Sequence, residues 1–311
     1  MIQNTKLARA VALAMTGTAL SVGGISTASA AATTMYNLFH EQAGAAPCAP
    51  CSNGETDGWV WGGVGTAPPA TNTATSASPG FVGIGGSSTP SSSTPFGYTG
   101  AAVVNWALEM TAVGDTATIS NQDSLKYGHS ADIDTAQGAW SDNALAGAQG
   151  WRHNLDFGLF RSTVDTWVTL SVHGVNSPSN NQFGFTIMKG MDTNASYQHH
   201  GAWNFGTDGA QTPCAGGPPA GGCSLTTADI VASSIGGTTP SNIGTISFHA
   251  LANQVYTVVL GGYRTGAWTS TTDGYTLSVA AVPIPAAAWL FGSALAGMGI
   301  IGRRKEKTLA A

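Results

Sequence analysis

From residue 103 onward, the chain shows short runs in which apolar and polar residues alternate. In residues 166–172, Trp167 and Thr169 share one side of an extended chain, and the aliphatic residues between them share the other. This period of two is typical of a strand with one buried face. Further strands are predicted at residues 103–108, 116–119, 183–188, 245–248, 255–260 and 275–279. Because turn residues separate the runs and no long helical period appears, we expect an all-β fold, an antiparallel β-sandwich of the jelly-roll kind.

The first thirty residues have the three parts of a secretory signal peptide. Lys6 and Arg9 supply a positive start, residues 11–22 are an apolar stretch, and residues 28–30 read Ala-Ser-Ala, small residues that suit a cleavage site. We therefore expect the Sec machinery to export the chain, and the mature protein to begin near Ala31.

The C-terminal residues 282–311 also contain three parts in order. A motif with two prolines is followed by sixteen uncharged residues, 286–301, and by a basic tail that includes Arg303 and Arg304. Sixteen residues fall just below the length of about 17–25 that a membrane-spanning helix needs. A basic tail behind such a helix stays on the cytoplasmic side. The motif consists of Val282, Pro283, Ile284, Pro285 and Ala286.

This C-terminal arrangement resembles the PEP-CTERM sorting signal in its VPLPA-type variant, with Ile284 in place of leucine. The resemblance implies a Gram-negative bacterium and an exosortase that cuts near the motif. It also implies a transient inner-membrane anchor through residues 286–301 and delivery to the cell surface or extracellular matrix, where exopolysaccharide is a partner. The resemblance covers residues 282–311 alone. An ordinary C-terminal membrane anchor is the alternative, and it would also place the body outside the cytoplasm.

Composition divides the mature body into two parts. Residues 58–108 contain no charged side chain, and 22 of the 30 residues in 66–95 are Thr, Ser, Pro or Gly. Because such a segment buries little apolar surface, residues 31–101 are predicted as a Cys-containing part with a linker, an O-glycosylated stretch or a long loop. Residues 102–281 are predicted as the sandwich domain. Its Gly- and Tyr-containing strands in 246–279 are similar to bacterial pre-peptidase C-terminal domains, which implies a fold and no activity.

The chain has four cysteines, and an even number in an exported protein favours disulfides. Three pairings are possible, and we expect the two local ones, Cys48–Cys51 and Cys214–Cys223. A thioredoxin-type redox pair at the first two positions would need a helix that the sequence does not show. A zinc site made of all four cysteines remains an alternative.

The net charge of the mature body excludes some classes of function. Outside the two terminal segments, five basic residues stand against fifteen acidic ones, a net charge of −10. This balance excludes a nucleic-acid partner and favours a cation as ligand. No nucleotide-binding loop, nucleophile elbow or zinc-protease motif is present, so we expect a non-enzymatic surface protein. Asp132, Asp134 and Asp142 have the oxygen ligands that calcium prefers, and a solvated turn is the alternative for them.

A second ligand hypothesis comes from Trp151 and His153, which project to the same face of an extended chain. Imidazole is a good copper ligand. The Trp-x-His motif resembles part of the site in methanotroph surface copper(I)-binding proteins, where two histidines and an oxidised tryptophan hold the metal. The resemblance implies Trp151 as the modified residue and His153 as a ligand. His129 and His173 are the candidates for the second histidine. The alternative is that Trp151 packs in the core and His153 lies at the surface.

Aromatic side chains supply a third hypothesis. The chain has nine Trp and seven Tyr, and their rings can stack on the apolar faces of sugars. Trp140, Trp203 and Trp268 stand beside turn-forming residues, so they are the candidates for a sugar-binding platform. A carbohydrate-binding module is therefore a further functional alternative.

Overall fold

The structure is a computed structural model of the chain. It describes residues 32–38, 80–99, 104–137, 139–140, 155–176, 178, 181–192, 225, 227–234, 243–263 and 272–282. All of them belong to the second of the two units into which the chain divides, Ala31–Ala311. The predicted signal peptide, the four cysteines and the sorting segment after Val282 lie outside the described residues. In the described part, no helix has the length and apolar character needed to span a membrane.

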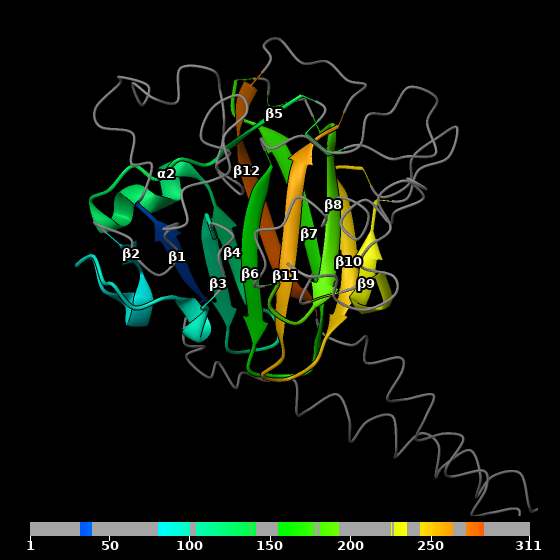
Figure 1. Ribbon diagram of the computed structural model, residues 1–311, viewed down its shortest axis with the longest axis horizontal. Coiled ribbons are helices and arrows are strands. Elements are labelled where there is room, and N and C mark those ends of the chain that lie inside the picture. The colour runs from blue at the N-terminus through cyan, green and yellow to red at the C-terminus, as the bar shows by residue number, and fades with distance from the viewer. Residues whose placement is uncertain are drawn as a thin grey trace, which may run out of the picture. The chain divides into compact units, whose positions relative to one another are not determined.

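The described strands form two sheets that lie one over the other (Figure 1). The seven-stranded sheet has the order β2-β1-β3-β6-β11-β8-β9. Its strands are β1 (Thr33–Asn37), β2 (Phe81–Val82), β3 (Trp106–Met110), β6 (Asp156–Ser162), β8 (Phe183–Lys189), β9 (Ile230–Ser233) and β11 (Val255–Gly262). All of its neighbouring strands are antiparallel except β3 and β6, which run parallel.

The five-stranded sheet has the order β10-β7-β12-β4, and β5 pairs with the start of β12. Its strands are β4 (Thr116–Ile119), β5 (Asp134–Ala136), β7 (Thr166–Gly174), β10 (Thr245–Ala250) and β12 (Thr272–Val282). Helical structure in the described part is limited to single turns: η1 (Ile84–Gly86), η2 (Pro95–Gly97), α2 (Asn121–Ser124), η3 (Leu125–Tyr127) and η5 (Thr227–Asp229).

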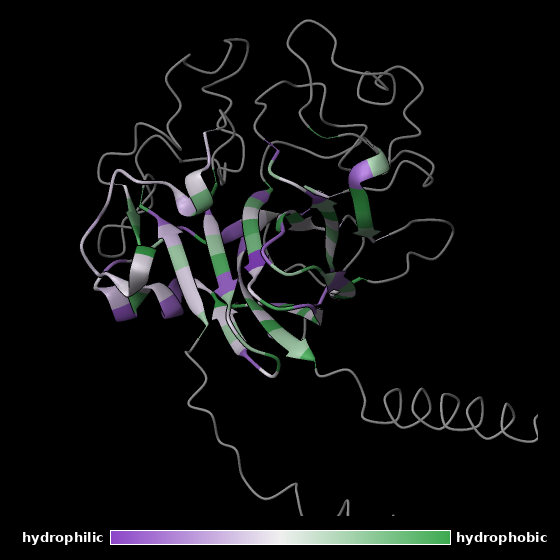
Figure 2. Cartoon of the chain, turned by 90° about the horizontal axis from the view of Figure 1, so that it is seen from below, coloured by the Kyte–Doolittle hydropathy of each residue, from purple (hydrophilic) through white to green (hydrophobic). Residues whose placement is uncertain are grey.

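The core lies between the two sheets, and the predicted all-β sandwich is confirmed. Phe248 on β10 packs against Phe160 and Tyr256 of the other sheet, with ring centroids 5.7 and 5.1 Å apart. Hydrophobic and hydrophilic colours alternate along the strands (Figure 2). The predicted alternation of residues 166–172 holds, because the aliphatic side chains of β7 are buried and Trp167 is 48% exposed. Because the inward side chains of the five-stranded sheet pack against the other sheet, buried and exposed residues alternate along β7 and β10.

The seven-stranded sheet is buried on both faces, so its strands do not all alternate. A second apolar cluster, which includes Phe157, Leu159 and Val259, covers the side that faces away from the five-stranded sheet. The long apolar runs of β8 and β11 were predicted although both of their faces are buried, whereas the short run of β6, which contains Gly158 and has a charged residue on each side, was not.

Residues before position 102 also belong to the seven-stranded sheet. β1 pairs with β3, and β2 pairs with β1. The described portion of the low-charge segment therefore supplies a strand whose two side chains, Phe81 and Val82, are buried. The seven-stranded sheet thus extends across the predicted boundary between residues 101 and 102.

Candidate functional site

The outward side of the five-stranded sheet carries rows of hydroxyl groups, which we call the hydroxyl face. Strand register places these residues in rows across β10, β7, β12 and β4. The hydroxyl face consists of Thr116, Thr118, Thr169, Ser171, Thr245, Ser247 and Ser278. Two pairs bond across β7 and β10: Thr169 with Ser247 at 2.8 Å, and Ser171 with Thr245 at 3.2 Å. These bonds fix the orientation of the hydroxyls on a regular backbone.

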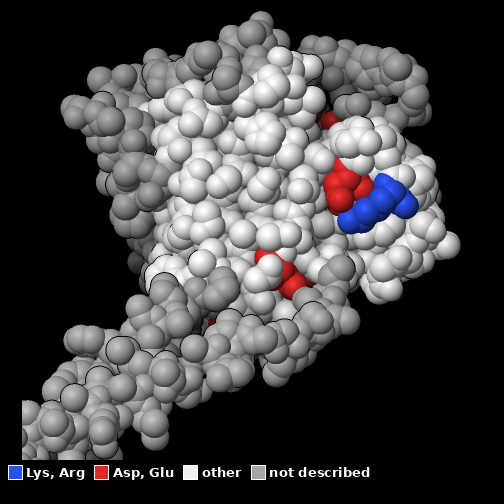
Figure 3. Space-filling view, turned by 180° about the vertical axis from the view of Figure 1, so that it is seen from behind, with Lys and Arg blue, Asp and Glu red and all other residues white. Residues whose placement is uncertain are grey.

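An exposed aromatic row borders the hydroxyl face. Trp167 stands between His249 and Val282 in the strand register, and its ring lies 5.6 Å from the His249 ring. None of the side chains of this row or of the hydroxyl face is Lys, Arg, Asp or Glu. Figure 3, which views the molecule from this side, shows a broad uncharged area with an acidic and a basic group to its right and acidic groups below it. The result is an uncharged surface with one large exposed ring.

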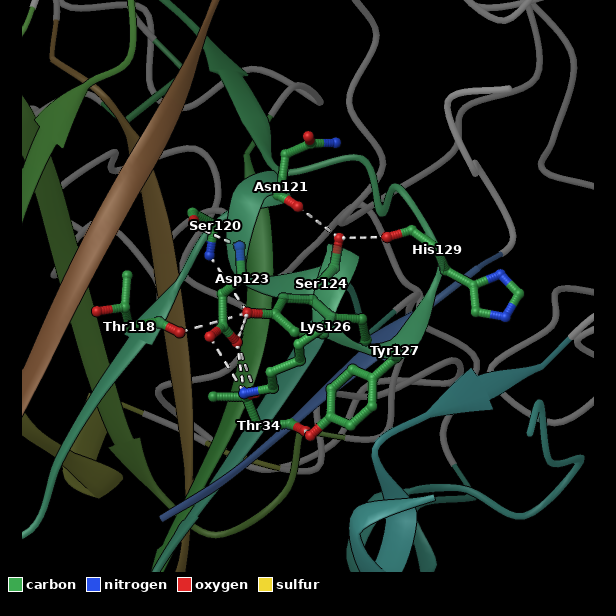
Figure 4. Close-up of polar contacts among 10 residues, drawn as sticks. Thr34, Thr118, Ser120, Asn121, Asp123, Ser124, Lys126, Tyr127 and His129 are labelled. Atoms are coloured by element: carbon green, nitrogen blue, oxygen red, sulfur yellow. Dashed lines mark hydrogen bonds and ion pairs between the residues drawn. The ribbon is translucent and has the colours of Figure 1, made fainter. Parts of the chain in front are cut away.

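A cavity of about 350 Å³ lies beside the hydroxyl face and is lined by β1, β4, β12 and the α2–η3 turn. Inside it, Lys126 Nζ forms an ion pair with Asp123 Oδ2 at 2.9 Å and donates to Thr34 Oγ1 at 2.6 Å. Thr34 Oγ1 and Tyr36 OH each donate to Asp123 Oδ2 at 2.7 Å. Figure 4 shows the Lys126 amine and the Asp123 carboxylate facing each other beside Thr34. The contacts hold both charged groups in fixed positions.

The local fold explains this arrangement. The Ser120 hydroxyl caps α2 by accepting a bond from the Asp123 amide at 3.0 Å, which sets the start of the turn. Burial raises the pKa of Tyr36 well above its usual value, and the nearby Asp123 raises it further. The Tyr36 phenol therefore stays protonated and donates to Asp123 at neutral pH. Residue spacing could not have indicated this site, because Tyr36 and Asp123 are 87 positions apart.

At the end of the sandwich where β5 pairs with β12, two buried aspartates, Asp134 and Asp156, have pKa values that neighbouring aspartates affect. Asp134 lies on β5, and Asp132 precedes that strand. Asp273 is the second residue of β12 and its side chain is buried, and Asp156 is the first residue of β6. The pKa of Asp134 is raised well above its usual value, mainly by burial and then by Asp132 and Asp273. Burial likewise raises the pKa of Asp156, with smaller contributions from Asp134 and Asp132, although Tyr275 opposes the rise. We call these four residues the aspartate cluster.

The sequence singled out only half of the aspartate cluster. Asp132 and Asp134 were candidates for calcium binding, and Asp142 lies beyond the residues that the structure describes. Asp156 and Asp273 were missed, because strand pairing brings them close from distant parts of the chain. An acidic residue at the head of an apolar run, such as Asp156 before Phe157, is the signal that would have pointed to it.

The copper candidates are placed only in part. Trp151 and His153 are outside the described residues. The His129 imidazole points away from the Asp123–Lys126 pair (Figure 4), and His173 pairs with Thr276 on the outward side of the five-stranded sheet. Among the described residues, no group of three or more His, Cys, Asp or Glu side chains is arranged to hold a metal ion.

The predicted aromatic platform needs a correction. Trp140 is 1% exposed, its ring packs against Tyr263, and its Nε1 donates to Thr186 Oγ1 at 3.2 Å. It is a core residue, so the prediction that it is an exposed platform was wrong. Trp203 and Trp268 are not among the residues described. The exposed ring is that of Trp167, whose outward direction the strand pattern predicted.

No protein-family model matches this chain, and no curated protein matches its sequence. Among solved structures, the chain is similar to PliG of Aeromonas hydrophila, a periplasmic lysozyme inhibitor of g-type lysozyme. The identity is 8% and the TM-score 0.24, over 56% of this chain and 96% of that one. It is also similar to CorA, a surface-associated copper-binding protein important in Methylomicrobium album BG8 copper acquisition. Here the identity is 14% and the TM-score 0.29, over 57% of this chain and 100% of that one.

These TM-scores are too low for either likeness to assign a fold or a function. No family match supports the resemblance to PEP-CTERM signals or to pre-peptidase C-terminal domains. Both resemblances therefore stay predictions from the sequence.

Proposed function

We propose that this protein is a non-enzymatic exported surface protein that binds a neutral polysaccharide on the hydroxyl face. The observation that carries the proposal is the exposed Trp167 ring at the edge of an uncharged, hydroxyl-lined sheet surface. Sugars present an apolar ring face and a rim of hydroxyls, so they need an aromatic ring to stack on and neutral polar groups beside it.

Pre-ordering of the surface favours binding. The hydroxyl pairs on β7 and β10 are already bonded to each other, and their backbone is held in a sheet. A ligand would therefore order few side chains, which lowers the entropic cost of association. Because the face has no Lys, Arg, Asp or Glu, a neutral chain would contact it without displacing counterions or burying an unpaired charge.

The neighbouring cavity supplies the stronger polar contacts. The Asp123 carboxylate can accept hydrogen bonds from a ligand, and the Lys126 amine can donate them. Hydrogen bonds to charged groups are shorter and stronger than those between neutral groups. Both side chains are fixed by Thr34 and Tyr36, so they would grip a sugar that reaches the cavity at the β4 edge of the face. We assign the stacking contact to Trp167 and the anchoring contact to this cavity.

Surface delivery is part of the proposal. β12 ends at Val282, the first residue of the predicted sorting motif. Cleavage by an exosortase after that motif would therefore leave every described strand intact. The Sec machinery, the exosortase and the inner membrane are the partners that this route requires.

A screen of the purified protein against neutral and charged glycans tests the ligand class. We expect binding to neutral polysaccharides that changes little between low and high salt, because salt screens ion pairs and a neutral ligand forms none with the protein. Binding restricted to anionic glycans, or no binding at all, would contradict the proposal.

Copper(I) binding is the alternative, and the Trp151–His153 motif is the observation that favours it. Protein purified from its native host would then contain stoichiometric copper and an oxidised Trp151, detected as a mass increase of the peptide. His153→Ala would lose the metal. Absence of copper together with an unmodified Trp151 would exclude this function.

A further inference from the structure

We propose that the hydroxyl face binds an extended segment of a neutral polysaccharide, several sugar units long, which crosses the strands from β10 to the cavity beside β4. This mode of binding rests on the proposed function, and it specifies how much of the polysaccharide the face contacts at once. Strand register fixes the sizes of the side chains across the five-stranded sheet, and these sizes define the path of the ligand.

Two parallel rows of small side chains cross the outward side of the sheet from edge to edge. Each row has one residue on β10, β7, β12 and β4, and no member is larger than threonine. The first row is Ser247, Thr169, Ala280 and Thr116, and the second is Thr245, Ser171, Ser278 and Thr118. Because neighbouring strands lie about 4.8 Å apart, each row is about 14 Å long. A path of this length exceeds a single sugar ring.

Larger side chains border the two rows on both sides. On one side the next row in the register is His249, Trp167 and Val282, and the Trp167 side chain is 48% exposed. On the other side, His173 lies beside Thr276. A sugar chain that ran along the strands would have to pass over Trp167 or His173. A chain that ran across the strands would follow the small side chains, with one sugar ring against Trp167.

The path across the strands ends in the cavity. The cavity is lined by the β12 and β4 members of both rows and by Asp123 and Lys126. Its volume of about 350 Å³ is near the lower end of the range of about 300–1,000 Å³ for small-molecule sites, so it holds only one end of such a segment. The remaining sugar units therefore lie on the rows, where each hydroxyl can both donate and accept a hydrogen bond.

The chemistry of the rows requires several sugar units. A hydrogen bond between neutral hydroxyls contributes little to affinity, because each partner gives up a bond to water. The affinity should therefore accumulate with the number of sugar units on the rows, until the path is filled. No member of either row is charged, so nothing along the path favours a charged sugar over a neutral one.

Isothermal titration calorimetry with sugars of increasing length tests the path on the purified full chain. The probes are dextran, pullulan, hydroxyethylcellulose and any further neutral polysaccharide that the glycan screen identifies, together with the oligosaccharides released from each by partial hydrolysis. For the polysaccharide that binds most tightly, the affinity should rise at least tenfold from its disaccharide to its hexasaccharide. It should change little for longer oligosaccharides, because the path is then filled.

A variant in the middle of the path locates the segment. Ser171→Gln places a longer neutral side chain on the second row, between Trp167 and the cavity, without altering either. It should remove most of the gain in affinity between the disaccharide and the hexasaccharide. Ser92→Gln is the matched control, since it makes the same substitution at an exposed position outside the five-stranded sheet. The control should keep the wild-type dependence on length.

Two outcomes overturn this mode of binding and leave the proposed function intact. One is a polysaccharide that binds while its disaccharide and hexasaccharide have equal affinity. The other is a folded Ser171→Gln variant with the wild-type dependence on length. Should Ser171→Gln fail to fold, the length series of the wild type decides. No binding to any neutral probe would contradict the proposed function itself, and this mode of binding with it.

Discussion

Two glycines allow tryptophan rings to lie directly on the seven-stranded sheet. A Cβ added at Gly158 would stand 2.3 Å from the Trp106 ring, and one at Gly184 would stand 2.2 Å from the Trp140 ring. Both rings are almost fully buried, so neither can move aside easily. Nothing in the spacing of these two glycines along the sequence reveals the rings that lie above them.

We expect Gly158→Ala to lower the free energy of unfolding by about 2 kcal/mol, because the added methyl group overpacks the core against Trp106. Urea unfolding measures the effect. Gly274→Ala is the control, since a Cβ there meets its neighbours at 3.4 Å or more. Equal stability of the two variants would show that Trp106 does not pack as described.

Buried carboxyls give the protein a predictable response to pH. Burial, then repulsion by Asp132 and Asp273, raises the pKa of Asp134 above its usual 3.8. The folded state therefore binds more protons than the unfolded chain from about pH 4 up to the folded-state pKa of Asp134. The contribution of Asp134 to stability is fully present below that pH and is lost as the pH rises through its folded-state pKa.

Asp134→Asn should flatten this decline, because an amide cannot titrate. Urea midpoints measured between pH 4 and pH 8 provide the profile. A variant profile as steep as that of the wild type would mean that Asp134 does not carry the buried charge.

At the scale of elements, the strand pattern was predictable where one face is exposed. β7 alternates as expected because only one side of it meets the core. β6 was missed because its apolar run is only four residues long, contains Gly158 and is bounded by Asp156 and Arg161. The parallel pairing of β3 and β6 depends on how the chain crosses the sheet, which local pattern does not encode.

The contact between the sheets should dominate stability. Phe248→Ala would remove a ring that packs edge-on against Phe160 and Tyr256, and we expect it to cost about 3–5 kcal/mol. Leu251→Ala, three residues further on and 40% exposed, should change stability by less than about 0.5 kcal/mol. Denaturant unfolding distinguishes the two, and a small effect of Phe248→Ala would contradict the packing of one sheet on the other.

At the scale of the whole molecule, composition indicated an acidic protein but not where its charge would gather. The four members of the aspartate cluster come from three separate stretches of sequence, and strand pairing brings them close. The uncharged face arises in the same way, from outward positions of β10, β7, β12 and β4 that only the register aligns. Residue types were therefore visible in the sequence, while their convergence required the fold.

The proposed export route predicts where a variant of the sorting motif is found in the cell. Pro283→Ala combined with Pro285→Ala should block cleavage at the motif and leave the protein in the membrane fraction, whereas the wild type reaches the cell surface. Fractionation followed by immunoblotting measures the distribution. Because β12 ends before both prolines, the variant should fold as the wild type does. Normal surface delivery of the variant would contradict exosortase sorting.

The affinity of Trp167→Ala for the best neutral glycan tests the central claim most directly. Isothermal titration calorimetry should show at least a tenfold loss relative to the wild type, about 1.4 kcal/mol, because the stacking ring is gone. Val231→Ala, a truncation at a 43% exposed position on β9 of the other sheet, should bind as the wild type does. Equal affinity of Trp167→Ala and the wild type would contradict polysaccharide binding on the hydroxyl face.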